Sequence, residues 1–364
     1  MSEWFKLARK FVKAGKLPLP INDTVLEILK IVLTEDQRDY LLKFKKNSYN
    51  INEIKEISDL DEKNLEKMLN DLMHLGMISG IPSRRAGIMV YRITPFFPGV
   101  LEFTLMRGET TPTTKKLASL WEKYFNEMSE AVQQNFDNFI PLIRQAATSI
   151  DRVVPVETQI EMKEEIVVPY EGLSKILDEC GTIGLMTCYC RHRKDLLGDP
   201  CKATDLRKNC FSFNRVADFL ISQGFAEEVS KGKALKILKK SEDDGLVHKA
   251  FHNALDPEKE LDGMCSCCSC CCGTFDIHYK GGIPLMSIAS YLAKVDGDNC
   301  IGCGTCVEKC NAKAIELIEN TAMIDEERCI GCGLCAHHCP EEAITMKRTG
   351  PRNVFVPPPR VSIN

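Results

Sequence analysis

The N-terminal stretch of the chain separates apolar from charged positions with the period of a helix. Residues 1–16 place Trp4, Phe5 and Phe11 on one side and lysines and arginines around the rest. The pattern predicts an amphipathic helix, which the Leu-Pro-Leu-Pro sequence at 17–20 ends because proline cannot continue a helix. We expect the apolar side to pack on the rest of the protein, with peripheral membrane contact or a partner helix as the alternative.

Helical periodicity continues downstream, interrupted by turn residues. Residues 51–57 and 61–75 predict two helices joined by a tight turn. The turn-like sequence at 82–87 and the apolar residues at 88–93 then predict a β-hairpin. This order resembles a winged-helix domain over about residues 22–95. The resemblance implies a module that binds either DNA or another protein.

The remaining pattern predicts a helical connector followed by a mixed domain. Apolar residues recur at helical spacing from 113 to 147. Between 151 and 290, helices and strands are expected to alternate, which favours an α/β domain. The expected elements are an extended segment at 153–168, helices at 170–180, 213–223 and 233–241, and a strand at 184–190. The proline-rich end of the chain predicts an extended tail.

Cysteine is the outlier in the composition. The 364 residues include 19 cysteines, all between Cys180 and Cys339, whereas 44% hydrophobic residues, 27% charged residues and a net charge of −4 give no bias toward nucleic acid. The sequence contains no secretory-signal pattern and no apolar run of about 20 residues. We therefore expect a reducing, cytoplasmic and anaerobic setting, in which such cysteines bind metal rather than form disulfides.

The strongest motif is an internal repeat of four cysteines. Cys300, Cys303, Cys306 and Cys310 recur 29 residues later as Cys329, Cys332, Cys335 and Cys339. Two-residue gaps let a curled backbone present three sulfurs to one iron–sulfur cluster, and the fourth cysteine of such a run characteristically serves the other cluster. Glycines at 302, 304, 331 and 333 let these loops approach a metal core without side-chain clashes.

This repeat resembles a bacterial-type ferredoxin with two [4Fe–4S] clusters. The resemblance implies two ligand sets, Cys300, Cys303, Cys306 and Cys339 for one cluster and Cys329, Cys332, Cys335 and Cys310 for the other. Asn311 departs from the family, which usually has proline after the fourth cysteine, and this weakens any inference about loop rigidity. A zinc knuckle is the alternative, but it normally uses two ligand pairs rather than two runs of four.

A second field of ten cysteines precedes the repeat. Its members are Cys188, Cys190, Cys201, Cys210, Cys265, Cys267, Cys268, Cys270, Cys271 and Cys272. The dense run at 265–272 predicts a loop that wraps metal, because neither a strand nor a helix could satisfy so many thiols by packing. We favour one or more additional iron–sulfur clusters. Structural zinc, for instance bound by Cys188 and Cys190 with a pair from the later run, and a dithiol redox site are the alternatives.

The overall arrangement is similar to a little-characterised group of multidomain ferredoxin-like proteins from anaerobes. Four segments carry the resemblance, Pro95–Gly99, Cys188–Arg191, Gly245–His248 and Cys265–Cys272. The group implies no settled activity.

A few single residues invite functional hypotheses. Arg191 opens a basic run at 191–194 that either offsets the charge of a thiolate-bound cluster or forms a solvated turn. His248 is a candidate for tuning a cluster or donating a proton, although a lone histidine is more often structural. Cys180 lies apart from the other cysteines, and we expect it to pack as a small buried hydrophobe.

Together these patterns predict an α+β multidomain protein. The expected parts are an N-terminal helix (1–20), a winged-helix-like domain (21–108), a helical connector (109–150), a cysteine-rich α/β metal domain (151–290), a ferredoxin domain with two clusters (291–348) and an extended tail (349–364).

The function that fits this organisation best is single-electron transfer, as a subunit or partner of a larger anaerobic oxidoreductase. The relay would run through the two ferredoxin clusters to or from a further iron–sulfur site. An enzyme that reduces a small substrate at the second cysteine field is the alternative. A DNA-binding redox regulator is disfavoured, because the expected recognition helix at 61–75 has more acidic than basic residues and would repel phosphates.

Overall fold

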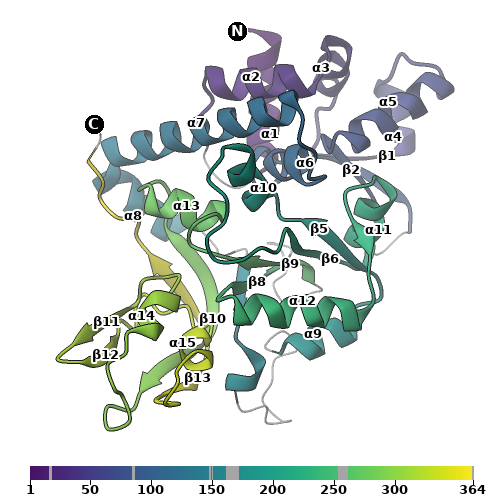
Figure 1. The fold of residues 1–364 in the computed structure, drawn as a ribbon. Helices are drawn as coiled ribbons and strands as arrows, with labels where there is room; N and C mark the ends of the chain where they lie inside the picture. Colours follow the sequence, from purple (N-terminus) through teal and green to yellow (C-terminus); the bar gives the residue numbers. More distant parts are fainter. Residues whose placement is uncertain are drawn as a thin grey trace. The chain divides into compact units, whose positions relative to one another are not determined.

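The computed structural model describes residues 1–15, 19–83, 87–146, 149, 151–160, 172–252 and 261–362. The chain divides into two compact units, each made of segments that are distant in sequence (Figure 1). Unit 1 contains residues 1–128, 186–200 and 215–227, and unit 2 contains residues 129–185, 201–214 and 228–364. Within the described residues, no helix is both long enough and apolar enough to cross a bilayer.

Unit 1 begins with helices that bury their apolar sides in one core. Helix α1 (Glu3–Ala14) places Leu7, Ala8 and Phe11 in that core, because these residues share one side of the helix. The elements that follow are α2 (Asp23–Val32), α3 (Glu35–Leu42), β1 (Ser48–Asn50), α4 (Ile51–Ile57), α5 (Glu62–His74), β2 (Ile78–Pro82) and β3 (Met89–Ile93). The three strands form an antiparallel sheet in the order β1-β3-β2.

The predicted helices at 51–57 and 61–75 correspond to α4 and α5. Asn50 caps α4 in a capping box with Glu53, and Asp61 caps α5, so both helices begin where the sequence supplies a capping side chain. Residues 84–86, in the predicted turn of the hairpin, lie outside the described residues. The assignment of this region as a winged helix stays a prediction.

The rest of unit 1 is largely helical. Its elements are the irregular segment Phe96–Val100, α6 (Leu101–Leu105), the first part of α7 (Pro112–Gln134), α10 (Tyr189–Leu196) and α11 (Asn214–Ser222). Phe96 packs on Trp121 and Tyr124, with ring centroids 5.0 and 5.5 Å away. The helical pattern predicted from 113 to 147 is divided between α7 and α8 (Phe136–Ala146).

Unit 2 is organised by an eight-stranded mixed sheet in the order β13-β10-β4-β8-β9-β6-β5-β7. The strands are β4 (Asp151–Val154), β5 (Ile183–Thr187), β6 (Lys208–Phe213), β7 (Glu227–Glu228), β8 (Val247–His252), β9 (Leu261–Cys267), β10 (Leu285–Val295) and β13 (Ile344–Val356). Strand β10 is parallel to β4, whereas β8 and β9 are antiparallel neighbours. Of the predicted extended segment 153–168, residues 161–168 lie outside the described residues.

Two apolar cores cover the two faces of this sheet. Helices α9 (Leu173–Glu179) and α12 (Lys231–Asp243) pack with Phe211, Ala250 and Met264 on one face (Figure 1). Helix α13 (Gly273–Tyr279) contributes Phe275 to the other core, which also contains Val247 and Cys267. Because side chains alternate along a strand, neighbouring residues of β8 and β9 face different cores.

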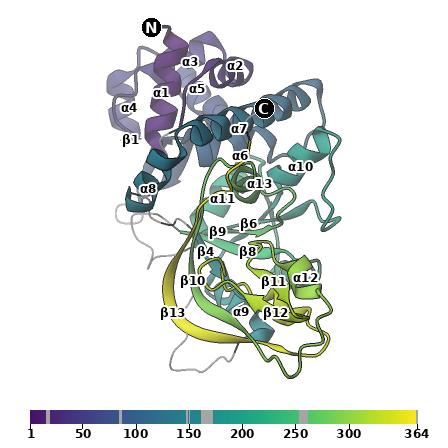
Figure 2. The ribbon, with the colours of Figure 1, turned by 90° about the vertical axis from the view of Figure 1, so that its left-hand side faces the viewer.

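The C-terminal cysteine repeat is built onto the edge of the same sheet. Its short elements are α14 (Thr305–Lys309), the hairpin β11 (Ile315–Ile318) and β12 (Thr321–Ile324), and α15 (Leu334–His337). Strands β10 and β13 pair antiparallel from Leu285↔Val356 to Val295↔Ile344, and Figure 2 shows them as one long curved pair. The predicted tail at 349–364 is therefore wrong for residues 349–356, which complete β13 because Val354 and Val356 bury their side chains in the core.

Candidate metal centres

The two halves of the C-terminal repeat adopt the same local structure. Gly304 and Gly333 take left-handed conformations immediately before α14 and α15, with φ of 80° and 77°. Each of these short helices carries the third cysteine of its run, Cys306 and Cys335. The backbone therefore curls in the same way around both sets of thiols, as expected from the spacing of the glycines.

Each half of the repeat borders its own cavity, and each cavity is lined by four cysteines. The first is lined by Cys300, Cys303, Cys306 and Cys339, and the second by Cys310, Cys329, Cys332 and Cys335. The fourth cysteine of each run thus lies at the cavity of the other run. The remaining lining is mostly apolar or glycine, and such a pocket of thiols fits a thiolate-bound [4Fe–4S] cluster.

Backbone N–H groups point at several of these sulfurs. Ala314 N donates to Cys310 Sγ over 3.2 Å, and Ala343 N donates to Cys339 Sγ over 3.3 Å, at equivalent positions of the repeat. Ala322 N lies 3.5 Å from Cys300 Sγ. Such N–H···S bonds stabilise negative charge on a sulfur and help to set the reduction potential of a bound cluster.

Individual cysteines of the two cavities differ in their exposure to solvent. Cys303 is exposed, whereas Cys329 and Cys335 are buried. Burial raises the pKa of Cys332 to about 12 and also raises that of Cys335, while a hydrogen bond with Thr305 lowers the pKa of Cys303. Metal binding at the second cavity must therefore displace protons from thiols that burial keeps neutral.

Gly302 and Gly304 provide a matched pair for testing how closely the first loop approaches its surroundings. A Cβ on Gly302 would lie 2.3 Å from the carbonyl oxygen of Asn320, whereas a Cβ on Gly304 would meet Leu317 at an ordinary 3.7 Å. Both positions have positive φ, so alanine costs about 1–2 kcal/mol of strain at either. We expect Gly302→Ala, but not Gly304→Ala, to lose about four irons per chain in anaerobic iron analysis. Equal iron contents would contradict this.

The second cysteine field is divided between the two units. Cys188 and Cys190 belong to unit 1, at the start of α10, and the other eight belong to unit 2. The prediction of a metal-wrapping loop over the whole run 265–272 is wrong for Cys265 and Cys267, because both are part of β9. Alternation along the strand places these two sulfurs on one face, so a strand accommodates them after all. The loop begins at Cys268.

Four thiols of this field lie close together. The Sγ atoms of Cys201, Cys268, Cys270 and Cys271 are all within 4.8 Å of one another, and we call these residues the Cys201 quartet. Hydrogen bonds from the neighbouring thiols, that of Cys268 foremost, lower the pKa of Cys201. Within the described residues this is the only such group of three or more cysteine, histidine or acidic side chains. It does not include Cys188 or Cys190, which the zinc hypothesis had paired with the later run.

A second group of cysteines lies on one face of the sheet in unit 2. Cys265 is the register partner of both Cys210 on β6 and Lys249 on β8. Cys267 forms a hydrogen bond with Cys272, which, together with burial, raises its pKa. These residues share the face that α13 covers.

Lys249 was not singled out from the sequence, yet it is the only lysine with less than 2% exposure among the described residues. Its Nζ lies 3.1 Å from Asp151 Oδ2 and 5.5 Å from the ring centre of Phe275. Burial lowers its pKa, but the attraction of Asp151, with the electrostatic effect of Cys267 and Cys272, outweighs burial and raises it. Its signal in the sequence is a lysine inside the apolar strand Leu-Val-His-Lys-Ala-Phe.

Asn311 connects the C-terminal repeat to the cysteine-rich loop. Its Oδ1 accepts from Ser269 N over 2.7 Å, and its Nδ2 donates to the carbonyl of Gly245 over 2.9 Å. The Tyr279 hydroxyl donates to the Asn311 carbonyl. Proline, the usual residue here in ferredoxins, has no side-chain polar groups to make the first two bonds. Through these two bonds, Asn311 holds the loop that carries Cys268, Cys270 and Cys271 close to the residue that follows Cys310.

The basic run at 191–194 is buried within unit 1, so the solvated turn suggested as one alternative is wrong. Arg191 and Arg193 are each 1% exposed. Arg193 pairs with Glu122 and lies over the ring of Phe125, and the ring Nε2 of His192 lies 2.9 Å from the carbonyl of Glu109. Packing of the long side chains against α7 explains why a charged run can be buried here.

His248 lies on the opposite face of the sheet from Cys265 and Cys267. Its Nδ1 is 3.0 Å from Ser266 Oγ, and its Nε2 is 3.4 Å from Glu242 Oε1. Its part in tuning a cluster stays a prediction. Cys180 is 8% exposed, as expected of a small buried hydrophobe. Its Sγ donates a hydrogen bond to the Ile176 carbonyl.

Comparison with known proteins adds one match. A family model described as a 4Fe–4S dicluster domain matches residues 293–346, which confirms the prediction of a ferredoxin-type domain at the C-terminal end. No curated protein and no solved structure matches the chain. Residues 293–346 thus form an iron–sulfur domain with an electron-transfer role.

Proposed function

We propose that this chain relays single electrons between a redox partner and a further iron–sulfur site in its own unit 2. The observation that carries the proposal is the pair of cavities, each lined by four cysteines, in the matched domain. When bound there, [4Fe–4S] clusters supply reversible one-electron transfer. The proposed ligands are Cys300, Cys303, Cys306 and Cys339 for one cluster and Cys310, Cys329, Cys332 and Cys335 for the other.

The first cavity offers a surface at which a partner can dock. Ile301 and Leu317 line it and are 62% and 41% exposed, and Cys303 between them is exposed as well. The carboxylate of Glu341 lies at the same cavity. An exposed apolar surface with acidic groups at its edge fits a redox protein whose docking site is apolar with basic groups around it.

The second cavity leads toward the cysteine-rich part of unit 2. Cys310 precedes Asn311, whose side chain accepts a hydrogen bond from Ser269 in the cysteine-rich loop. For the further iron–sulfur site we propose Cys265, Cys267 and Cys272, because these thiols share one face and the cation of Lys249 compensates their negative charge. Cys210, the register partner of Cys265, is the candidate for a fourth ligand.

The partner is proposed to be a larger oxidoreductase that the N-terminal region helps to dock. Helix α5 would be the recognition helix of a winged helix, and it exposes Glu62, Glu66 and Asp71 against Lys63 and Lys67. This acidic surface disfavours DNA, whose affinity for proteins depends largely on cation–phosphate contacts. Protein docking uses the same surface without that penalty. Membrane contact by α1 is disfavoured because Leu7, Ala8 and Phe11 are buried in unit 1 and Trp4 and Phe5 are half-buried.

Anaerobic analysis of the full chain tests this proposal. We expect more than eight irons per chain, about eight of them from the two clusters of the C-terminal domain, together with dithionite-reduced EPR signals beyond those of two coupled clusters. Cys267→Ser should lower the iron content to about eight, and Cys180→Ser should leave it unchanged. A protein that holds fewer than about eight irons after reconstitution, or that dithionite does not reduce, would refute the relay.

A further inference from the structure

We propose that the Cys201 quartet binds one zinc ion in a tetrahedral site of four thiolates. This site goes beyond the proposed relay, because zinc has no accessible redox change and carries no electron. It would instead fix the loop between β9 and α13 to the loop that follows α10 in sequence.

The spacing of the sulfurs fits a single ion. Cys201 Sγ is 3.7 Å from Cys268 Sγ and 3.8 Å from Cys270 Sγ. Cys270 Sγ is 3.5 Å from Cys268 Sγ and 3.6 Å from Cys271 Sγ. Four sulfurs at about 2.3 Å from one zinc ion lie about 3.8 Å from one another at the corners of a tetrahedron. The distances are far too long for disulfides, which need about 2.05 Å.

The same spacing argues against a cubane cluster at this position. In a cubane each cysteine binds a different iron, so the four sulfurs lie outside the cluster and farther apart than sulfurs that share one ion. The chain supplies its own comparison. Among the described residues, the Sγ atoms of the Cys201 quartet lie within 4.8 Å of one another, whereas the cysteines of neither C-terminal cavity form such a group.

The coordination shell of the quartet is closed. Four thiolates fill all four positions of a tetrahedral ion and leave none for water or substrate, which is the arrangement of structural rather than catalytic zinc. Cys268 and Cys271 are 2% and 1% exposed and pack on Leu246, which is also 1% exposed. This apolar support holds the sulfurs in place and restricts access of solvent to the ion.

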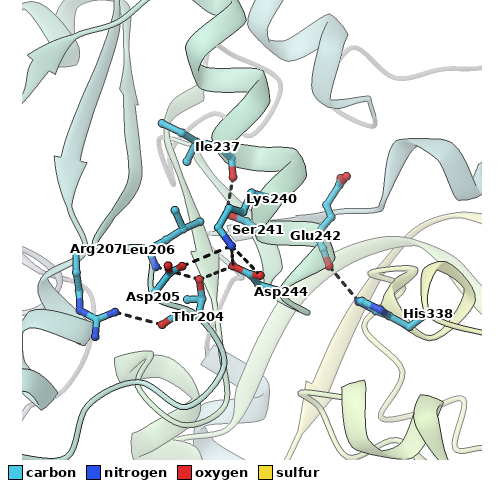
Figure 3. Close-up of polar contacts among 10 residues, drawn as sticks. All are labelled: Thr204, Asp205, Leu206, Arg207, Ile237, Lys240, Ser241, Glu242, Asp244 and His338. Atoms are coloured by element: carbon cyan, nitrogen blue, oxygen red, sulfur yellow. Dashed lines mark hydrogen bonds and ion pairs between the residues drawn. The ribbon is translucent and has the colours of Figure 1, made fainter.

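The loop that carries Cys201 is anchored independently of metal. Thr204 Oγ1 donates to Asp244 Oδ2 over 2.5 Å, and Arg207 donates to the Thr204 carbonyl over 3.2 Å (Figure 3). Lys240 on α12 bridges Asp205 and Asp244, at 3.5 and 3.0 Å (Figure 3). These contacts fix the loop to the end of α12 only a few residues before Leu246, so the thiol of Cys201 is positioned for the other three.

Metal analysis of the anaerobic full chain tests the site. We expect about one zinc per chain, and zinc absorption-edge spectroscopy of the unaltered protein should find four sulfur neighbours at about 2.3 Å. Cys201→Ser and Cys270→Ser should each lower zinc occupancy at least tenfold without changing the iron content, while Cys180→Ser, a buried thiol outside the quartet, should keep the zinc. Because the spectrum is measured on the unaltered chain, the test does not depend on the variants folding.

Other results would overturn the proposal. Iron in place of zinc at the quartet, nitrogen or oxygen neighbours around zinc, or zinc retained in both variants would each do so. The outcome is separable from that of the relay. Loss of iron from the C-terminal cavities with zinc retained would count against the relay alone, and absence of zinc with full iron would count against this site alone.

Discussion

Asp151→Ala is expected to lower the free energy of unfolding of unit 2 by about 3–5 kcal/mol, because it leaves the buried cation of Lys249 without its counter-charge. The side chains of Asp151 and Lys249 are 6% and 1% exposed, so water cannot replace the lost partner. Ser287 Oγ also donates to Asp151 over 2.5 Å, and this hydroxyl would lose its acceptor. Asp151 belongs to β4 and Lys249 to β8, so the loss falls in the centre of the sheet.

Amide hydrogen exchange in β4, β8 and β10 measures this effect directly. We expect the protected amides of these strands to exchange at least about 100-fold faster in Asp151→Ala. The combined replacement of Asp151 by Leu and Lys249 by Met removes both charges and should recover most of the loss, since apolar residues of similar volume often replace a buried ion pair well. Exchange at the unaltered rate in Asp151→Ala would mean that the pair does not stabilise the sheet.

Double replacements in the C-terminal repeat are expected to reveal which cysteines share a cluster. Any single alanine replacement at a ligand should remove about four irons. Cys339→Ala combined with Cys303→Ala should remove no more than either alone, because both residues line the first cavity. Cys339→Ala combined with Cys332→Ala should remove about eight, because the two residues line different cavities.

The control for this experiment replaces Cys310, the fourth cysteine of the first run, instead of Cys339. Cys310→Ala combined with Cys332→Ala should remove about four irons, and Cys310→Ala combined with Cys303→Ala about eight. If Cys310→Ala combined with Cys303→Ala removed only about four irons, the two residues would bind the same cluster. The proposal that the fourth cysteine of each run binds the other run's cluster would then be wrong. Iron and sulfide contents of anaerobically reconstituted protein give the answer without a functional assay.

Some of the fold and of the site followed from the sequence because local rules determine them. The helix at 51–57 is found at those residues because Asn50 and Glu53 form its capping box. The C-terminal repeat was recognisable because metal ligation requires its spacing and its glycines. The residues of the capping box, and three of the four cysteines at each cavity, are only a few positions apart in sequence.

The other features depend on contacts between distant parts of the chain. Cys201 joins Cys268 across two helices and four strands, and nothing in its local sequence distinguishes it from Cys210. The burial of Arg193 depends on Glu122, which is remote in sequence. Asn311 was noticed only as a departure from a family pattern, and its role required the structure to bring Ser269 beside it.

The long pairing of β10 with β13 has a consequence for the order in which the protein assembles. The strands are joined by a segment that contains all eight cysteines of the C-terminal repeat, so their pairing must close a large loop. The entropy cost of that closure grows with loop length and has to be overcome before the pairing stabilises the chain. Metal insertion crosslinks the segment internally and shortens the flexible chain that remains. We therefore expect cofactor loading and closure of this strand pair to be coupled steps of folding.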